Sequence, residues 1–307
     1  MPTRHKVRRK DQGHKPSALT RLQSQLEARL RAAHFRYLNE QLYSLDSHEV
    51  FQLFLKQPEL FALYHKGYQE QVAKWPLNPT QVCLELLKRR IHQFHRMRGT
   101  KAHPQNTTFN AQAFSIVDMG CGEATIAASL DSRLANSWSA RNGFTVEVHS
   151  YDLVAANELV TACDLARGTG LPSDCADAVV FCLSLMGPNY GAMVKEGLRL
   201  LRCDPTRSGL LLIIEITSRF QSRAETRDTP GARVQLQRGA STTASTMSSS
   251  VEADFVVALE SLGLRLQEHR QLHDYFTLFV FEATESAARR IHIIEMPSLK
   301  PCLYKKR

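Results

Sequence analysis

The hexapeptide Val117-Asp118-Met119-Gly120-Cys121-Gly122 (VDMGCG, residues 117–122) follows an apolar stretch and precedes a helical pattern. Glycines at such a turn let the backbone approach a ligand closely, and the first turn of the helix leaves N–H groups free. A dinucleotide fingerprint would need a third glycine at position 125, which is Thr125. The pattern D-x-G-x-G suits instead the amino-acid end and the sugar of S-adenosylmethionine, the alternative being a purely structural turn. We therefore expect Asp118, Gly120 and Gly122 to form a cofactor-binding turn between a strand and a helix.

Around this turn, apolar segments alternate with helical ones. The expected strands are 114–117, 146–151, 159–161, 178–185, 210–216 and 275–281, and the expected helices between them are 124–134, 190–201 and 251–262. The runs AVVFCLSL (178–185) and LLLIIEI (210–216) are almost entirely apolar, which indicates burial on both faces of a mostly parallel sheet. No long helix separates the last strands, so we expect an antiparallel hairpin there. The pattern predicts an α/β, Rossmann-like fold.

In the first third of the chain, the apolar residues have the spacing of helices. Leu19, Leu22, Leu26 and Leu30 recur at helical spacing. A second helix is expected near Ser47, with an incomplete capping box because Val50 stands three residues on. Pro58 and Pro79 suit the first turns of two further helices. The predicted organisation is a disordered basic tail (1–17), a helical cap region (18–97), a linker (98–112) and a ligand-binding domain (113–307) with a mobile insertion at about 218–250.

Composition narrows the class of protein. The chain has 307 residues, a formal net charge of +9 and basic clusters at both ends, which suit phosphate backbones or serve only as solvated tails. No apolar run approaches the roughly 20 residues of a membrane span, and the N-terminus lacks the apolar core of a secretory signal. Seven cysteines without a metal-ligand spacing predict reduced thiols inside the cell and no metal site.

Three further positions are candidates for cofactor binding. Asp152 ends the second expected strand, where a carboxylate can accept both hydroxyls of a ribose, although it could equally cap a helix. Asp164, or the backbone beside it, follows a short strand and could meet the exocyclic amine of an adenine. Cys182 lies in the fourth strand, where a small core residue or a wall of the pocket is the simpler interpretation than a nucleophile.

Several longer stretches carry a resemblance to a known family. They are FRYLNEQLYSL (35–45), YHKGYQEQVAKWPLNP (64–79), VDMGCG (117–122), VHSYDLVA (148–155), VTACDLA (160–166), AVVFCLSLMGPN (178–189), EITSRF (215–220) and LKPCLYKKR (299–307). The chain thereby resembles the ribosomal RNA-processing protein 8 family, also called nucleomethylin in animals. The resemblance implies a class I S-adenosylmethionine methyltransferase sheet with an N-terminal helical cap, forming 1-methyladenine in large-subunit rRNA during ribosome biogenesis. It places cofactor contacts on His65, Gly120, Asp152, Asp164, Leu165 and Cys182.

The resemblance also implies partners and a location. We expect a monomeric catalytic unit in the nucleus and nucleolus that binds large-subunit rRNA and nucleolar or chromatin proteins, with no membrane partner. Attack by adenine N1 needs little acid–base help, so no catalytic residue is predicted, and Asn189 is the candidate for positioning the base edge. The chain departs from the family pattern at His273-Asp274-Tyr275, at Pro188-Asn189 and in the lengthened segments 132–145 and 221–250.

Two alternatives stay open from the sequence. One is a nucleolar or chromatin scaffold in ribosomal-gene silencing, which would bind S-adenosylmethionine with little catalysis. The other is a methyltransferase acting on a protein or a small molecule. The intact set Asp118, Gly120, Gly122 and Asp152 favours an enzyme over the scaffold.

Overall fold

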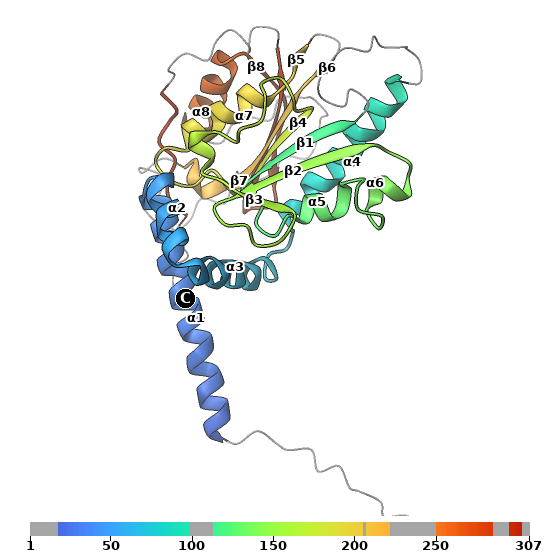
Figure 1. The fold of residues 1–307 in the computed structure, drawn as a ribbon. Helices are drawn as coiled ribbons and strands as arrows, with labels where there is room; N and C mark the ends of the chain where they lie inside the picture. The colour runs from blue at the N-terminus through green and yellow to red at the C-terminus, as the bar shows by residue number, and fades with distance from the viewer. Residues whose placement is uncertain (1–17, 99–112, 205–206, 222–249, 285–294, 303–307) are drawn as a thin grey trace, which may run out of the picture.

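A seven-stranded sheet forms the centre of the molecule (Figure 1). The computed structural model describes residues 18–98, 113–204, 207–221, 250–284 and 295–302. The strands are β1 Phe114–Met119, β2 Val146–Asp152, β3 Val160–Ala162, β4 Ala178–Cys182, β5 Cys203–Asp204, β6 Arg207–Ser208, β7 Leu210–Ile216, β8 Leu264–Leu272 and β9 Phe276–Ala283. The sheet order is β3-β2-β1-β4-β7-β9-β8, and β5 and β6 pair separately.

The pairing confirms the predicted Rossmann-like sheet. β1, β2, β3, β4 and β7 pair in parallel, whereas β9 runs antiparallel to both β7 and β8. The predicted hairpin is therefore β8–β9, with β9 inserted between β7 and β8. β7 is buried along nearly its whole length, as its apolar run indicates.

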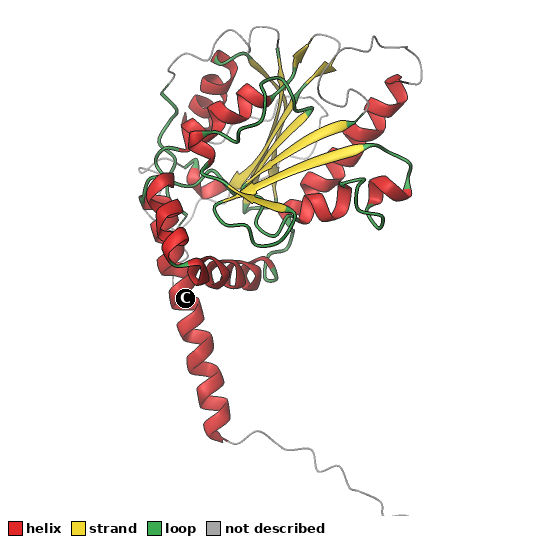
Figure 2. Cartoon of the chain, viewed as in Figure 1, coloured by secondary structure: helices red, strands yellow, loops and turns green. Residues whose placement is uncertain are grey.

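Helices cover both faces of the sheet (Figure 2). They are α1 Ala18–Ser44, α2 Ser47–Lys56, α3 Pro58–Val72, α4 Pro79–Arg98, α5 Thr125–Leu130, α6 Trp138–Arg141, α7 Tyr190–Leu200 and α8 Ser250–Ser261, with 3-10 turns η1 Leu165–Arg167 and η2 Thr217–Arg219. One core cluster joins α7 and α8 to one face of the sheet. A second cluster joins α4 and α5 to the opposite face, through Leu84, Leu87, Ile91, Ile126 and Leu130. The predicted first turns at Pro58 and Pro79 are confirmed.

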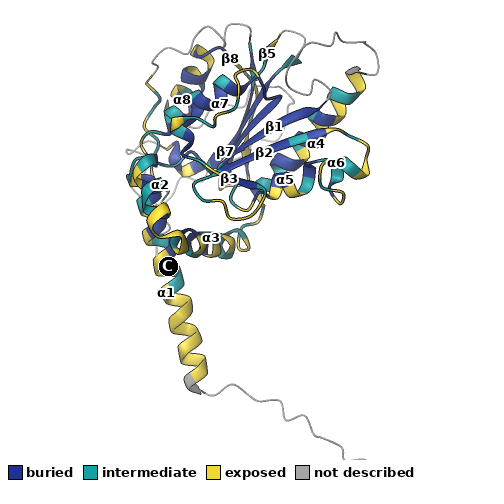
Figure 3. Cartoon of the chain, in the orientation of Figure 1, coloured by how far each residue is buried: buried dark blue, intermediate teal, exposed yellow. Residues whose placement is uncertain are grey.

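Helices α1, α2 and α3 lie beyond the sheet, and we refer to them as the cap. Their apolar residues form a third cluster that includes Phe35, Val50, Phe54 and Phe61. The helix that the leucine spacing predicts is α1, but Leu22, Leu26 and Leu30 are not part of this cluster. Leu22, Leu26 and Leu30 are each more than half exposed, on the part of α1 that extends away from the body (Figure 3).

Several predicted boundaries are wrong. The capping residue of α2 is Asp46, and it forms a complete capping box with Glu49, so Ser47 is the first helical residue and not the cap. The helix expected at 124–134 covers Thr125–Leu130, because Asp131 turns away and accepts the N–H of Val148. The strand expected at 178–185 ends at Cys182, and the next residue, Leu183, has a positive φ of 58°.

Some predictions lie outside the described residues. These are the basic tail (1–17), nearly all of the linker (99–112) and residues 222–249 of the predicted insertion. No helix among the described residues is long and apolar enough to cross a membrane.

Candidate functional site

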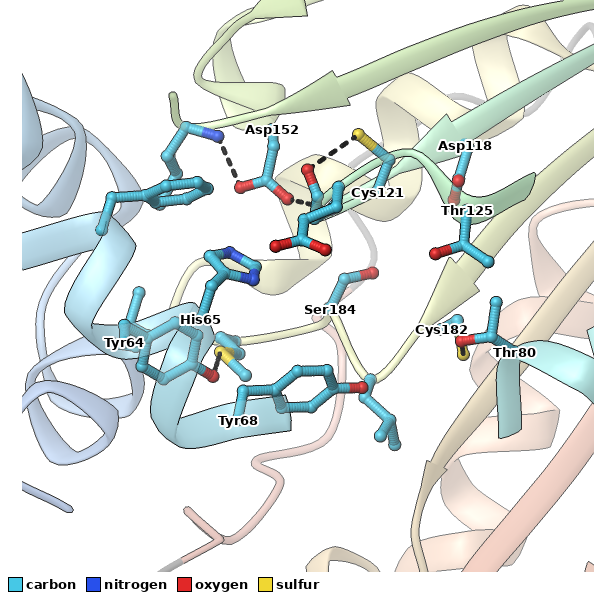
Figure 4. A pocket seen from close by; sticks show the side chains of 18 of the residues that line it. Tyr64, His65, Tyr68, Thr80, Asp118, Cys121, Thr125, Asp152, Cys182 and Ser184 are labelled. Carbon is cyan, nitrogen blue, oxygen red and sulfur yellow. Dashed lines mark hydrogen bonds between the residues drawn. The ribbon is translucent and has the colours of Figure 1, made fainter. Parts of the chain in front are cut away.

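A cavity of about 420 Å³ opens where the carboxyl ends of β1, β2 and β4 meet the cap (Figure 4). Its volume is within the roughly 300–1,000 Å³ of small-molecule sites. Ligands of open α/β sheets bind at this edge. They bind at the topological switch point, where the strand order reverses and the connections of two neighbouring strands lead to opposite sides. Helix α3 supplies the opposite wall, through side chains that include Tyr64, His65 and Tyr68.

The glycine turn forms one side of this cavity. Gly120 and Gly122 have φ values of 81° and 59°, in the region that favours glycine. The N–H groups of Gly120 and Cys121 both donate to the Tyr151 carbonyl, which ties the turn to the end of β2. A Cβ atom at Gly120 would overlap the Cβ of Ser184, so glycine is required for packing as well as for conformation. Ser184 donates its hydroxyl to the Met119 carbonyl over 2.5 Å.

Asp152 lies beside the turn at the end of β2. Its Oδ2 accepts the Gly122 N–H over 2.7 Å, and its Oδ1 accepts the N–H of Leu153 over 2.7 Å. Burial raises the pKa of Asp152, whereas the nearby His65 opposes that rise. Each carboxylate oxygen retains a lone pair, so a ribose hydroxyl at this position could still donate to it.

His65 reaches from α3 over the glycine turn. A Cβ atom at Gly122 would lie 3.1 Å from Cε1 of His65, and the imidazole packs against Phe61 with ring centroids 4.2 Å apart. Burial lowers the pKa of His65, although the charges of Asp152 and Glu123 oppose the effect. At neutral pH the ring is therefore mostly uncharged and forms a polar lid over the turn.

Asp118 is the most deeply buried acidic group in the lining of the cavity. It is 3% exposed, and burial together with the neighbouring Asp152 charge raises its pKa to about 7. Among the described residues, three carboxyl groups line this cavity, those of Asp118, Glu123 and Asp152, and no lysine or arginine does. A ligand carrying positive charge would stabilise these carboxylates. The sulfonium and ammonium groups of S-adenosylmethionine have that charge, and the two glycines provide the close backbone approach, so the residues present fit this cofactor.

The structure brings most of the predicted site residues together. His65, Asp118, Gly120, Gly122, Asp152, Leu165 and Cys182 all line the cavity. Asp164 and Asn189 are not among its lining residues. Both side chains bind Ser47 instead, Asp164 through the Ser47 hydroxyl and Asn189 through its hydroxyl and its N–H. The expected direct contact of Asn189 with a bound base therefore has no support from this geometry.

Sequence reasoning named His65 but missed other lining residues between α3 and the start of α4. Tyr68 of α3, Asn78 in the loop after it and Thr80 at the start of α4 also border the cavity, and the Thr80 hydroxyl lies 3.9 Å from the Cys182 sulfur. Figure 4 shows Thr80 and Cys182 at the opposite side of the cavity from Asp152. The spacing of Tyr64 and Tyr68, four residues apart on one helix, was the available signal that both rings face the same way.

A parallel sheet with one inserted antiparallel strand, an acidic cavity and a D-x-G-x-G turn define a class I S-adenosylmethionine-dependent methyltransferase. The family described as "Hypothetical methyltransferase" matches residues 21–229. The chain belongs to this family, together with the ribosomal RNA-processing protein 8 proteins.

Curated relatives match along most of the chain. It is 33% identical to the "25S rRNA (adenine(645)-N(1))-methyltransferase" of Schizosaccharomyces pombe, over 98% of this chain and 77% of that protein. It is 33% identical to "Ribosomal RNA-processing protein 8" of Arabidopsis thaliana, over 92% of this chain and 77% of that protein. The chain is also 31% identical to a "25S rRNA (adenine(645)-N(1))-methyltransferase" of Saccharomyces cerevisiae, over 94% of this chain and 72% of that protein.

Proposed function

We propose that this protein transfers the methyl group of S-adenosylmethionine to N1 of an adenine in large-subunit rRNA, in the nucleolus, during ribosome biogenesis. The substrate is inferred from relatives at 31–33% identity that are named for this reaction. The structural observation that supports it is the cavity lining, in which the described residues supply carboxyl groups, no lysine or arginine, and an aromatic wall from the cap.

The charge of the lining suits methylation of a neutral ring nitrogen. When bound, the cofactor supplies an electrophilic methyl group, whose bond to sulfur breaks as the N1 lone pair forms the new N–C bond and takes over the positive charge. Asp118 and Asp152 face a cationic ligand before the transfer and a cationic base after it. Because the total charge in the cavity is unchanged, the same carboxylates stabilise both states.

We assign Asp152 to the cofactor ribose, the glycine turn and Asp118 to its amino-acid end, and Leu165 and Cys182 to the walls around it. His65 would cover the cofactor from the cap. Tyr68, Asn78 and Thr80, which also line the cavity, would then surround the accepting base. We place the base against Tyr68 because an extruded base binds by stacking on aromatic side chains. This replaces Asn189 as the residue in contact with the base.

No general base is needed in this reaction, because N1 carries a free lone pair. The residues of the cavity act by holding the two reactants in line and by excluding water, an effect worth up to roughly 7–11 kcal/mol. N1 is on the Watson–Crick edge, so a paired adenine must first leave its helix. A cavity between the cap and the sheet suits a base that is presented in this way.

The test is transfer of tritiated methyl groups to unmodified large-subunit rRNA, followed by primer extension to locate the product. We expect a stop at one adenine, and its loss in Asp152→Ala and Gly120→Arg. Incorporation into peptides but not into RNA would contradict the proposed substrate. Cofactor binding without any transfer would favour a scaffold function in its place.

A further inference from the structure

Ser47 lies where three segments distant in sequence meet. It is the first residue of α2, it is 4% exposed, and it borders the cavity. One neighbour is Asp164, in the turn before η1, and the other is Asn189, directly before α7. The corner between α1 and α2 is thereby joined to two loops at the carboxyl edge of the sheet.

The Ser47 side chain takes part in two hydrogen bonds. Its Oγ donates to Oδ1 of Asp164 over 2.7 Å and accepts from Nδ2 of Asn189 over 2.8 Å. The backbone N–H of Ser47 also donates to Oδ1 of Asn189, over 3.1 Å. The amide of Asn189 therefore binds both the backbone and the side chain of this one serine.

Asp164 depends on this contact. It is 5% exposed, and among the described residues its Oδ1 accepts hydrogen bonds from the Ser47 hydroxyl and from the Ala166 N–H. Its Oδ2 faces Nδ1 of His48 at 3.7 Å, and neither of these two buried atoms has a hydrogen bond within the described part of the chain. The Ser47 hydroxyl thus donates a side-chain hydrogen bond that stabilises the nearly buried carboxylate of Asp164.

The same corner packs tightly on the loop after β4. Gly187 has a φ of 81°, and a Cβ atom there would lie 3.0 Å from the Leu45 carbonyl oxygen and 3.3 Å from Oδ1 of Asn189. This loop also carries Ser184 and Met186, which line the cavity. A shift of the α1–α2 corner would therefore move part of the cavity wall.

We propose that Ser47 is a positioning residue for the cofactor site. Its hydroxyl holds the cap against Asp164 and Asn189, and thereby fixes Leu165 on one side of the cavity and the loop after β4 on the other. Asp164 and Asn189 form this junction with Ser47. Because the junction concerns cofactor binding, the inference holds whichever acceptor is methylated.

The test is the affinity of the full-length protein for S-adenosylhomocysteine, measured by calorimetry without RNA. Ser47→Ala removes the donor to Asp164, and a hydrogen bond to a charged group is strong enough that its loss predicts roughly tenfold weaker binding. Helix α2 retains its Asp46 cap in this variant, and alanine is a good helix former, so the variant is expected to fold. Ser47→Thr keeps the hydroxyl and should restore most of the affinity.

Ser44→Ala is the matched control, because Ser44 is exposed at the same corner. We expect it to bind S-adenosylhomocysteine like the wild type. Asn189→Ala and the Ser47→Ala/Asn189→Ala double variant should show non-additive losses, because the two residues bind each other. Unchanged affinity in Ser47→Ala would overturn the proposal, and so would an equal loss in Ser44→Ala or strictly additive losses in the double variant.

Discussion

At the scale of single residues, Asp118 links ligand binding to pH. Its pKa is raised to about 7, mainly by burial and then by Asp152. A cation bound in the cavity favours the ionised form, so binding lowers this pKa and releases a proton. We therefore expect S-adenosylmethionine to bind more tightly as the pH rises from roughly 6 to 8. Calorimetry in buffers of different ionisation enthalpy measures the released protons, and Asp118→Asn should release fewer.

The same raised pKa affects the stability of the free protein. An unfolded aspartate has a pKa of about 3.9, so the folded state binds more protons between that value and about 7. The contribution of Asp118 to stability is complete below the unfolded pKa and is lost as the pH rises through the folded pKa. Asp118→Asn should flatten this part of the stability profile in thermal denaturation. An unaltered slope in the variant would argue against a buried, protonated Asp118.

Tyr68 gives a separate test of the proposed base position. Tyr68→Leu removes the aromatic face, whereas Tyr68→Phe keeps it. Stacking is worth about 1–3 kcal/mol per base, so we expect kcat/KM for RNA to fall roughly 5- to 150-fold in the leucine variant and little in the phenylalanine variant. Affinity for S-adenosylhomocysteine should change little in either. Equal kcat/KM for RNA in both variants would place the base elsewhere in the cavity.

At the scale of elements, the sequence was most informative where one local physical preference determines the structure of a segment. The apolar run of β7 predicts burial on both faces, and Pro58 and Pro79 predict first helical turns. The pattern failed where tertiary contacts decide. Leu183 adopts a positive φ that its side chain does not favour, which ends β4 early. Its N–H donates to the Ile214 carbonyl of β7, a contact that no local pattern contains.

In the candidate site, too, some features can be predicted from the sequence and others depend on tertiary contacts. The glycine turn and Asp152 could be predicted, because strand ends and glycines are visible in one sequence. The junction of Ser47, Asp164 and Asn189 could not, because its members are separated by 117 and 142 residues. Asp164 and Asn189 were noticed as polar groups at strand ends, but their partner is a serine that sequence reasoning treated as a helix cap.

Close packing of α1 and α3 gives a prediction at this scale. Gly67 lies in α3, and a Cβ atom there would be 2.6 Å from Cβ of Phe35 in α1. Because Phe35 Cβ is fixed to the backbone, Gly67→Ala should force the helices apart and destabilise the cap by about 1–3 kcal/mol, despite the better helix propensity of alanine. Since His65 is on the same helix, cofactor affinity should also fall. Hydrogen exchange of α3 measures the change.

Lys66→Ala is the control for Gly67→Ala, because Lys66 is exposed on the same helix. Surface substitutions of this kind usually change stability by no more than about 0.5 kcal/mol. If the hydrogen-exchange rates of α3 were the same in Gly67→Ala as in Lys66→Ala, the two helices would tolerate a wider separation than the structure indicates.

At the scale of the whole molecule, residues 295–302 join elements from both ends of the chain. The Tyr190 hydroxyl of α7 donates to the Pro297 carbonyl over 2.5 Å. Lys300 exchanges two hydrogen bonds with Arg219, which follows β7. Nδ2 of Asn39, in α1, donates to the Cys302 carbonyl over 2.6 Å. Residues 295–302 therefore link α1 of the cap to α7 and to the turn after β7.

Arg219 contacts both Lys300 of this segment and Tyr43 of α1, and its loss should affect distant elements together. It is 2% exposed, its Nη1 lies 2.9 Å from Oε2 of the fully buried Glu215, and its guanidinium is 4.9 Å from the Tyr43 ring centroid. Oε1 of Glu215 in turn accepts the N–H of Leu185, in the loop after β4. Arg219→Met leaves a buried carboxylate without its cation, so we expect a loss of about 3–5 kcal/mol in denaturant unfolding.

A matched double variant separates charge from packing. In Arg219→Met/Glu215→Gln, the amide oxygen can still accept the Leu185 N–H but carries no charge, so the double variant should be more stable than Arg219→Met alone. Hydrogen exchange should increase in Arg219→Met both at Leu185 and along residues 39–43 of α1, because one side chain supports both. If exchange increased only near Leu185, the C-terminal segment would hold α1 without help from Arg219. If the double variant were no more stable than Arg219→Met, the uncompensated charge could not be the cause of the loss.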